Sequence, residues 1–321
     1  MSTAETKAAD MSQAGMSLVF VLAIDHRNSL RQWYRATTGK LAADTRVLLA
    51  AKGVVLDGML HAIGAGMPRQ QAVLLADDEY GAAAIRRARE HGIVTALAVE
   101  RSGQPEFSFE HRDRFGEHIE RSGADIIKAL VRYNVDGDQH CNARSRARFR
   151  ELARWLNGRG LPLMLELLVP PQPHQLARVG GDRERFDREM RPALTVRAMR
   201  ELIAVGLAPR YWKIEGQPST ATCQELARAA AATAQTRCLV LGRGEDAAAV
   251  RRWLALAAPV EGFGGFAIGR TIWSGPLEAW LAGRADGQAA ARLIGERYLS
   301  FALLYLRHTR LRPEQPHART C

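Results

Sequence analysis

Cysteine, which stabilises small secreted domains through disulfides and binds structural zinc, is scarce in the 321-residue sequence. The sequence has no CxxC pair, and none of its cysteines stands at a metal-ligand spacing from a histidine; they are Cys141, Cys223, Cys238 and Cys321. This pattern predicts neither a disulfide framework nor a structural zinc site, and it fits a reducing cytosol. The first residues do not resemble a signal peptide, and we expect no apolar stretch near the roughly 20 residues of a membrane span. The sequence therefore predicts a soluble, cytoplasmic protein.

Lysine is the second scarce residue. Only five of the 45 basic residues are lysines, and the rest are arginines. Arginine stays protonated, whereas a desolvated lysine can lose its proton and become a nucleophile. Of the five, Lys128 and Lys213 lie in apolar segments. We therefore expect chemistry at one or both of these two positions.

The net charge of +11 raises the question of a nucleic-acid partner. The cations, however, are interleaved with acidic residues along the chain, as in RRAREH and GDRERFDREMR. We find no helix-turn-helix, zinc-finger or RNA-binding signature. The charge pattern favours a solvated, arginine-rich surface that attracts anionic small molecules, and it predicts no nucleic-acid partner.

Short apolar runs alternate with helix-period segments along most of the chain. Eight such runs predict strands; they begin at Leu18, Gln71, Ile93, Ala124, Leu161, Arg210, Cys238 and Gly264. Strands that are apolar on both faces are typical of buried parallel sheets. Glycines stand where the intervening helices should end, at Gly92, Gly123, Gly160 and Gly206.

Eight strand–helix units predict an α/β fold, a single (β/α)8 TIM barrel. We place the barrel at residues 17–308, between a disordered N-terminal segment, 1–16, and a flexible C-terminal tail, 309–321. A doubly wound open sheet is the alternative. That fold would favour a glycine-rich phosphate loop after the first strand, where the chain instead has Asp25, His26, Arg27 and Asn28.

Charged residues stand at or near the carboxyl end of nearly every predicted strand, where barrel enzymes carry their catalytic groups. In strand order they are Asp25, Arg27, Asp77, Glu79, Glu100, Arg101, Lys128, Arg132, Glu166, Lys213, Glu215, Arg243 and Arg270. An ionised group in a buried strand costs several kcal/mol unless it is paired. These residues are therefore either catalytic or members of buried ion pairs that hold the barrel mouth together.

Several of these strand ends resemble one family of enzymes. The runs AIDHR, LLADDEYG, AVERSG, IIKALVRY, LMLEL, WKIE and GFAIGRTIW follow, in order, those of the class I aldolases that act on tagatose bisphosphate. WKIEG, VLGRGED and GFAIGRTIW are more similar still to a related group, the 2-deoxy-5-keto-gluconate 6-phosphate aldolases of inositol catabolism. Two departures from the tagatose group, His26 in place of a glutamine and LGRGED in place of a small-residue loop, favour the sugar-acid phosphate as substrate.

The resemblance implies a role for each matching residue. Lys213 corresponds to the Schiff-base lysine and Glu166 to the proton-transfer residue, with Lys128 and Asp25 as supporting polar groups. Gly269 and Arg270 would belong to the phosphate site. Apart from the resemblance, barrels usually hold phosphate at the ends of strands 7 and 8, which adds Gly242 and Arg243 to this site. A substrate carboxylate would need a further cation, for which we consider Arg27, Arg101 and Arg132, and Glu100 joins the predicted substrate-binding residues. The residues themselves leave open whether Asp25 or Glu166 takes the proton during carbon–carbon cleavage.

The sequence offers alternatives to a class I aldolase of a sugar-acid phosphate. A metal-dependent barrel aldolase would need several histidine or carboxylate ligands at strand ends, but of the nine histidines only His26 lies at one. We interpret His61, His91, His111 and His118 as helix-surface residues and predict neither a catalytic metal nor a cofactor. The expected partner is a phosphorylated sugar acid or ketose, and the sequence leaves the oligomeric state open. Another ketose mono- or bisphosphate aldolase, or a sugar-phosphate-binding regulator, are the alternatives.

Overall fold

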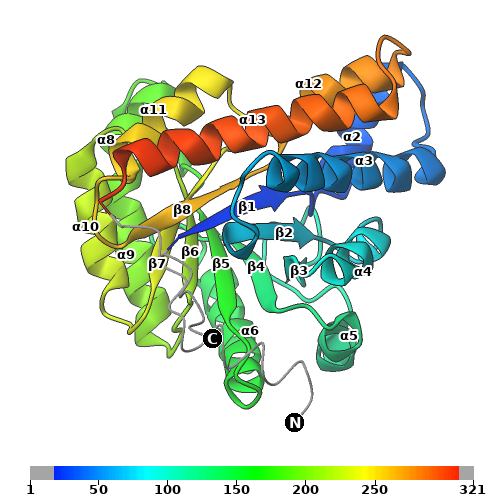
Figure 1. Ribbon diagram of the computed structural model, residues 1–321. Coiled ribbons are helices and arrows are strands. Elements are labelled where there is room, and N and C mark those ends of the chain that lie inside the picture. The colour runs from blue at the N-terminus through cyan, green and yellow to red at the C-terminus, as the bar shows by residue number, and fades with distance from the viewer. Residues whose placement is uncertain (1–17, 311–321) are drawn as a thin grey trace, which may run out of the picture.

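The apolar runs form eight short strands, all parallel and paired in chain order into a closed barrel (Figure 1). The computed structural model describes residues 18–310. The strands are β1 Val19–Ala23, β2 Ala72–Ala76, β3 Val94–Ala98, β4 Ile126–Arg132, β5 Leu163–Leu168, β6 Tyr211–Glu215, β7 Arg237–Leu241 and β8 Phe263–Ile268. The predicted (β/α)8 barrel is confirmed. The predicted N-terminal segment, and all of the predicted tail except residues 309 and 310, lie outside the described residues.

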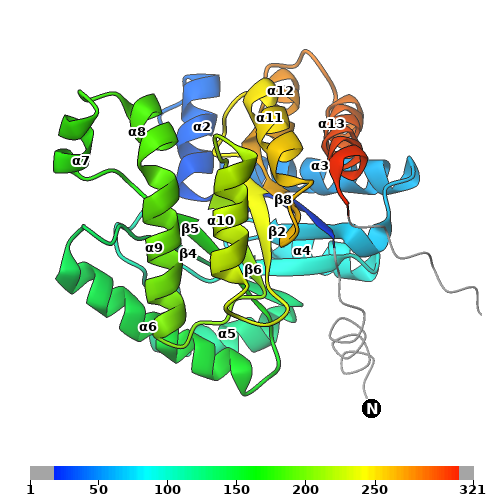
Figure 2. The same ribbon diagram turned by 90° about the vertical axis from the view of Figure 1, so that its left-hand side faces the viewer.

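The helices surround this barrel and connect its strands (Figure 2). They are α2 Asn28–Thr38, α3 Thr45–Gly64, α4 Ala82–Glu90, α5 Phe115–Ser122, α6 Gln139–Asn157, α7 Pro173–Arg178, α8 Arg183–Glu189, α9 Arg191–Ala204, α10 Thr220–Ala230, α11 Ala247–Ala257, α12 Arg270–Leu281 and α13 Gly287–His308, with short 3₁₀ turns η1 Arg69–Gln71 and η2 Arg112–Arg114. The four glycines expected at helix ends all have positive φ, between 61° and 90°. Glycine adopts this conformation without a steric penalty, which explains its use there.

Side chains alternate between the barrel interior and the layer beneath the helices, as the strand period of two requires. The interior holds a small apolar cluster; its members include Val19, Val73, Val94, Ile126, Met164, Tyr211, Leu239 and Ala267. The residues between them point outward into the larger core under the helices. Further toward the carboxyl ends, Lys128 on β4, Glu166 on β5 and Lys213 on β6 continue the inward-facing rows. The candidate site therefore begins where these charged side chains interrupt the apolar filling of the barrel.

One helix, α3, contradicts the expectation that no apolar stretch approaches the length of a membrane span. α3 has 20 residues and is apolar enough to cross a membrane by length and composition alone, so the expectation of no such stretch was wrong. Its predicted apolar face, Leu48, Ala51, Val55 and Met59, is buried. The helix lies along α13 on the outside of the barrel, as both views show (Figures 1 and 2). Packing between helices and sheet accounts for its composition.

Candidate active site

Strand alternation and register bring three charged side chains together inside the barrel mouth. Lys128 on β4, Glu166 on β5 and Lys213 on β6 share the inward parity of the interior apolar residues of their strands. Glu166 is the direct register partner of Lys213 on one side and of Leu130 on the other. Because Leu130 is two residues beyond Lys128, the carboxylate of Glu166 has a lysine within reach on each neighbouring strand.

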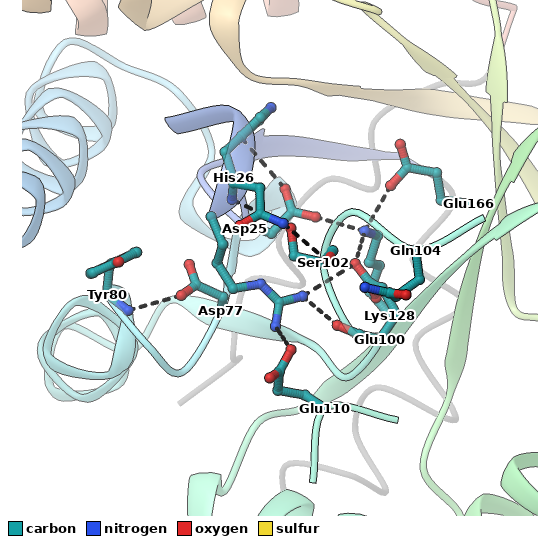
Figure 3. Close-up of polar contacts among 12 residues, drawn as sticks. Asp25, His26, Asp77, Tyr80, Glu100, Ser102, Gln104, Glu110, Lys128 and Glu166 are labelled. Carbon is teal, nitrogen blue, oxygen red and sulfur yellow. Dashed lines mark hydrogen bonds and ion pairs between the residues drawn. The ribbon is translucent and has the colours of Figure 1, made fainter. Parts of the chain in front are cut away.

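Lys128 lies at the centre of the polar network. Its Nζ is 2.7 Å from Asp25 Oδ2, 2.7 Å from Glu100 Oε1 and 2.8 Å from Glu166 Oε2, and Figure 3 shows the ammonium group between the three carboxylates. The Lys128 side chain is only 1% exposed. A compact ammonium with three donors suits this arrangement, since each carboxylate can accept one of its protons.

Lys213 has a different environment. Its Nζ is 2.9 Å from Glu166 Oε2, the same oxygen that Lys128 contacts. That is the one ion pair of Lys213 among the described residues, and the oxygen is shared. Lys213 and Glu166 both line an open cavity, whereas Lys128 does not. The lysine that faces the cavity is thus the less tightly held of the two.

The buried charges change one another's proton affinities. Burial alone would lower the pKa of Lys128, but Asp25, Glu100 and Glu166 outweigh it and hold that pKa well above the usual range. Burial would raise the pKa of Asp25 and of Glu166, yet Lys128 and Lys213 keep both below their ordinary values, Asp25 well below. The resting network therefore contains a protonated Lys128 and the ionised side chains of Asp25 and Glu166.

A cavity of about 440 Å³ opens at the carboxyl ends of the strands. The predicted residues that line it are Arg132, Glu166, Lys213, Gly242, Arg243, Gly269 and Arg270. Lys128 is buried beneath its floor and contacts Asp25 and Glu100, which also lie outside the lining. The predicted set thus divides into groups that line the cavity and groups that contact them from beneath.

Arg27 does not occupy the position that its sequence suggests. Its side chain is 2% exposed, donates to Glu110 at 2.9 Å and to the backbone carbonyl of Glu100, and lies outside the cavity lining. Arg101 is exposed and also outside the lining. Of the three arginines considered for a substrate carboxylate, Arg132 alone lines the cavity; its Nη1 donates to the Gln104 carbonyl at 3.0 Å. Arg27 instead supports Glu100 from behind.

The segments after β7 and β8 form the side of the cavity opposite β4. Arg243 has a left-handed backbone with φ of 52°, a strained conformation for a non-glycine residue. Its guanidinium is paired with Asp187 at 2.7 Å and with Glu215 at 3.3 Å. Arg270 donates to the Arg243 carbonyl at 2.6 Å. Arg243 therefore anchors this loop, while Arg270 keeps donors for a ligand.

The start of α12 adds backbone donors to the same wall. Gly269 precedes the helix and provides no side-chain cap. A Cβ at this position would lie 2.5 Å from the Ala23 carbonyl oxygen and 2.8 Å from the His26 ring, so only glycine fits. Free N–H groups at a helix N-terminus favour anions. With Arg270, this end of the cavity suits a phosphate group.

The sequence prediction missed a second group of charges between β5 and β6. Arg183 and Asp187 on α8, and Arg191 on α9, line the cavity, although the composition of their segment, GDRERFDREMR, predicts a solvated surface. Arg191 is 4% exposed and pairs with Asp187 and, at 3.4 Å, with Glu215. Burial lowers the pKa of Arg191 to about 10. The i, i+4 spacing of Asp187 and Arg191 was the one sequence signal of this pairing.

A third buried lysine was also missed. Lys52 of α3 is 2% exposed and pairs with Asp77, which is fully buried beyond the end of β2. Lys52 also donates to the His26 carbonyl at 3.1 Å. It does not line the cavity of the candidate site. This pair connects the first helical layer to the β1 and β2 ends, and we assign it a structural role.

Comparison with known proteins agrees with the architecture. The chain is 29% identical over 160 residues to tagatose 1,6-diphosphate aldolase 1 of Streptococcus pyogenes serotype M1, a match that covers 47% of this chain and 45% of that protein. The chain thus matches about half the length of this curated relative. Fructose-bisphosphate aldolase of Plasmodium falciparum has the same fold, with a TM-score of 0.64, 12% identity and coverage of 94% of this chain and 96% of that one.

A Schiff-base-forming fructose-1,6-bisphosphate aldolase also matches, with a TM-score of 0.56, 15% identity and coverage of 91% of this chain and 98% of that one. Identities this low show a shared fold. The family is established separately, by a match over nearly the whole chain. Residues 5–309 match a family described as "Uncharacterized protein conserved in bacteria (DUF2090)", and this chain belongs to that family.

Proposed function

We propose that this protein is a class I aldolase that cleaves a phosphorylated sugar through an imine on Lys213. One observation carries the proposal: in the wall of an open cavity, Lys213 Nζ lies 2.9 Å from the carboxylate of Glu166. A nucleophilic amine and an adjacent proton carrier are the two groups that imine formation requires. The similar Streptococcus protein is named as an aldolase, and the similar fructose-1,6-bisphosphate aldolase is described as Schiff-base-forming, which supports this chemistry.

The two neighbouring lysines are not equivalent candidates for the nucleophile. Three carboxylates hold Lys128 protonated, and it does not reach the cavity surface. Lys213 has one carboxylate partner, which it shares, and it faces the cavity. A nucleophile must be neutral when it attacks and must touch the substrate. Lys213 lines the cavity in which the substrate would bind, and Glu166 can take the proton that makes its amine neutral.

Glu166 can serve each proton transfer of imine formation. As a carboxylate it accepts a proton from the Lys213 ammonium, whose amine then attacks the substrate ketone to give a carbinolamine. Loss of the Lys213 charge removes one of the two cations that keep the pKa of Glu166 low, so the glutamic acid becomes easier to form. It then donates its proton to the departing hydroxyl, which leaves as water, and a protonated imine remains.

Carbon–carbon cleavage needs a base for the hydroxyl proton at the carbon that becomes the aldehyde. As that proton leaves, the C–C bond breaks and its electron pair moves into the imine to form an enamine. Asp25 and Glu166 are the two candidates for this base. Glu166 lines the cavity, whereas Asp25 reaches the site through Lys128, so the lining favours Glu166. Protonation of the enamine and hydrolysis of the imine release the second product.

For the substrate we propose 2-deoxy-5-keto-gluconate 6-phosphate, which would give dihydroxyacetone phosphate and malonate semialdehyde. Its phosphate would bind Gly269, Arg270 and the Gly242 segment, and its carboxylate would bind Arg132 across the cavity. A ketose bisphosphate is the second candidate, because Arg132 could bind a second phosphate equally well and the similar Streptococcus protein is named for a tagatose bisphosphate. The two candidate substrates differ in the group that Arg132 would bind, which is a carboxylate in one and a second phosphate in the other.

Borohydride reduction tests the nucleophile without depending on the sugar. Dihydroxyacetone phosphate is a product in either case, so the protein should be inactivated when both reagents are present and should gain a mass adduct on the YWKIEG peptide. Lys213→Arg should abolish the adduct, since a guanidinium cannot form the imine. Lys40→Arg, at an exposed lysine, is the matched control and should retain it. An adduct that persists in Lys213→Arg, or one that requires a divalent metal ion, contradicts the proposal.

A further inference from the structure

Three potential metal ligands converge outside the cavity. Asp78 follows β2, His111 precedes η2 and His118 lies on α5. His111 Nε2 is 2.5 Å and His118 Nε2 is 3.1 Å from the same oxygen, Asp78 Oδ2. Among residues 18–310 this is the one group of three such side chains whose ligand atoms all lie within 4.8 Å of one another. None of the three lines the candidate active site.

A hydrogen-bonded His–Asp–His group does not account fully for this geometry. The His111 contact satisfies hydrogen-bond geometry, but His118 Nε2 makes no hydrogen bond even though the atom is hidden from solvent. The two imidazole rings are stacked with centroids 3.8 Å apart. Two stacked histidines that both direct Nε2 at one carboxylate oxygen are arranged as ligands of a single cation, which would bind the lone pair that His118 leaves unused.

We propose that Asp78, His111 and His118 bind one divalent transition-metal ion, with Zn²⁺ as the best chemical match. Two imidazole nitrogens and a carboxylate oxygen are borderline ligands that suit zinc and its neighbours better than Mg²⁺ or Ca²⁺. At zinc–ligand distances of about 2.0–2.2 Å, tetrahedral ligand atoms lie roughly 3.3 Å apart, so shifts on the order of 1 Å complete the site. His111 is 39% exposed, which leaves solvent access for a fourth ligand, water.

The position of the site indicates a structural task. The ion would connect the β2–α4 loop to η2 and α5, which come from different units of the barrel. Asp77, next to Asp78, holds Lys52, and Glu110, next to His111, holds Arg27, which in turn contacts Glu100. The metal would thus fix the backbone of two residues that support the buried charges from outside. It would not participate in imine chemistry.

Titration of the full-length chain, without a polyhistidine tag and after removal of metals by chelation, tests the site. Zn²⁺ should bind at one equivalent per chain and raise Tm, as any ligand specific to the folded state does, whereas Mg²⁺ should do neither. Co²⁺ should give visible d–d bands without a thiolate charge-transfer band, which excludes binding at Cys141. Absence of zinc binding by the wild-type chain overturns the proposal.

Variants distinguish this site from scattered surface binding. His118→Gln and Asp78→Asn should each weaken Zn²⁺ binding by more than about 10-fold. Loss of a residue that only hydrogen-bonds to a metal ligand already weakens binding by about that factor, and loss of a ligand should cost more. His91→Gln, at an exposed histidine at the end of α4, is the matched control and should bind as the wild type does. If His118→Gln does not fold, His111→Gln replaces it, at the more exposed ligand. Unchanged affinity in the ligand variants overturns the proposal, whatever the outcome of imine trapping.

Discussion

Replacement of Glu166 by glutamine separates catalysis from the buried ion network. Glutamine keeps the shape of the side chain and an oxygen acceptor, but it cannot take a proton from Lys213 or return one to the carbinolamine. Loss of a general acid–base group lowers kcat roughly 10²- to 10⁴-fold with a modest change in KM. That loss corresponds to about 2.7–5.4 kcal/mol of transition-state stabilisation.

The stability change follows from the contacts that Glu166 makes. Its Oε2 lies 2.8 Å from Lys128 and 2.9 Å from Lys213. Breaking a buried ion pair outright costs about 3–5 kcal/mol. Here Lys128 keeps Asp25 and Glu100, and the amide oxygen of glutamine still accepts a hydrogen bond. We therefore expect a loss of about 2 kcal/mol, a decrease in Tm of roughly 4 °C.

Asp77→Asn is the matched control, because Asp77 is also buried and paired with a lysine but lies outside the cavity. It should lower Tm by at least as much, because Lys52 has no second carboxylate partner among the described residues, and it should leave kcat within about threefold. The assay couples release of dihydroxyacetone phosphate to NADH oxidation, with thermal unfolding of both variants in the same buffer. A folded Glu166→Gln protein with near-normal kcat, or equal kcat losses in both variants, would refute the proton-transfer role.

Two further predictions concern the cavity rim. Burial lowers the pKa of His26 from 6.5 to about 4, so the folded state resists a proton that the unfolded chain accepts; stability should be full above pH 6.5 and fall by about 3 kcal/mol as the pH drops to 4. The urea concentration at the unfolding midpoint, measured between pH 7 and 4.5, should fall less steeply with decreasing pH in His26→Gln than in the wild type. If the midpoints of the two proteins fall in parallel, this assignment is contradicted. Arg132→Ala should lower kcat/KM for the sugar-acid phosphate roughly 10- to 150-fold and spare a ketose monophosphate, while Arg270→Ala should weaken both. Equal losses for the two substrates in Arg132→Ala would favour a ketose substrate.

The fold was predictable because apolar periodicity alone encodes it. Eight runs that are apolar on both faces are typical of a parallel sheet covered by helices, and the closed barrel buries all eight. Within a strand, the side-chain period of two also fixes which residues point into the barrel. Once Met164 and Tyr211 are known to point inward, Glu166 and Lys213 must do so too. The core of the candidate site therefore followed from strand assignment.

Residues beyond the strand ends were less predictable, because no period governs them. Arg27 lies four residues after β1, and the local turn directs it behind Glu100 rather than into the cavity. Arg191 lies in a segment whose composition resembles a solvated surface, and its burial depends on where α8 and α9 cross the mouth. His111 and His118 meet Asp78 only through tertiary packing. The positions of these side chains were thus established by the structure alone.

Buried lysines occur in this chain for more than one physical reason. Lys52, Lys128 and Lys213 are all buried, yet their surroundings differ. Lys128 occupies a position where one compact ammonium contacts three carboxylates, which a planar guanidinium with its fixed fork could not do in the same space. By drawing Asp25 and Glu100 to itself, it leaves Lys213 with a shared oxygen of Glu166 alone. In the proposed mechanism, a charged Lys128 therefore leaves Lys213 a carboxylate that can take its proton.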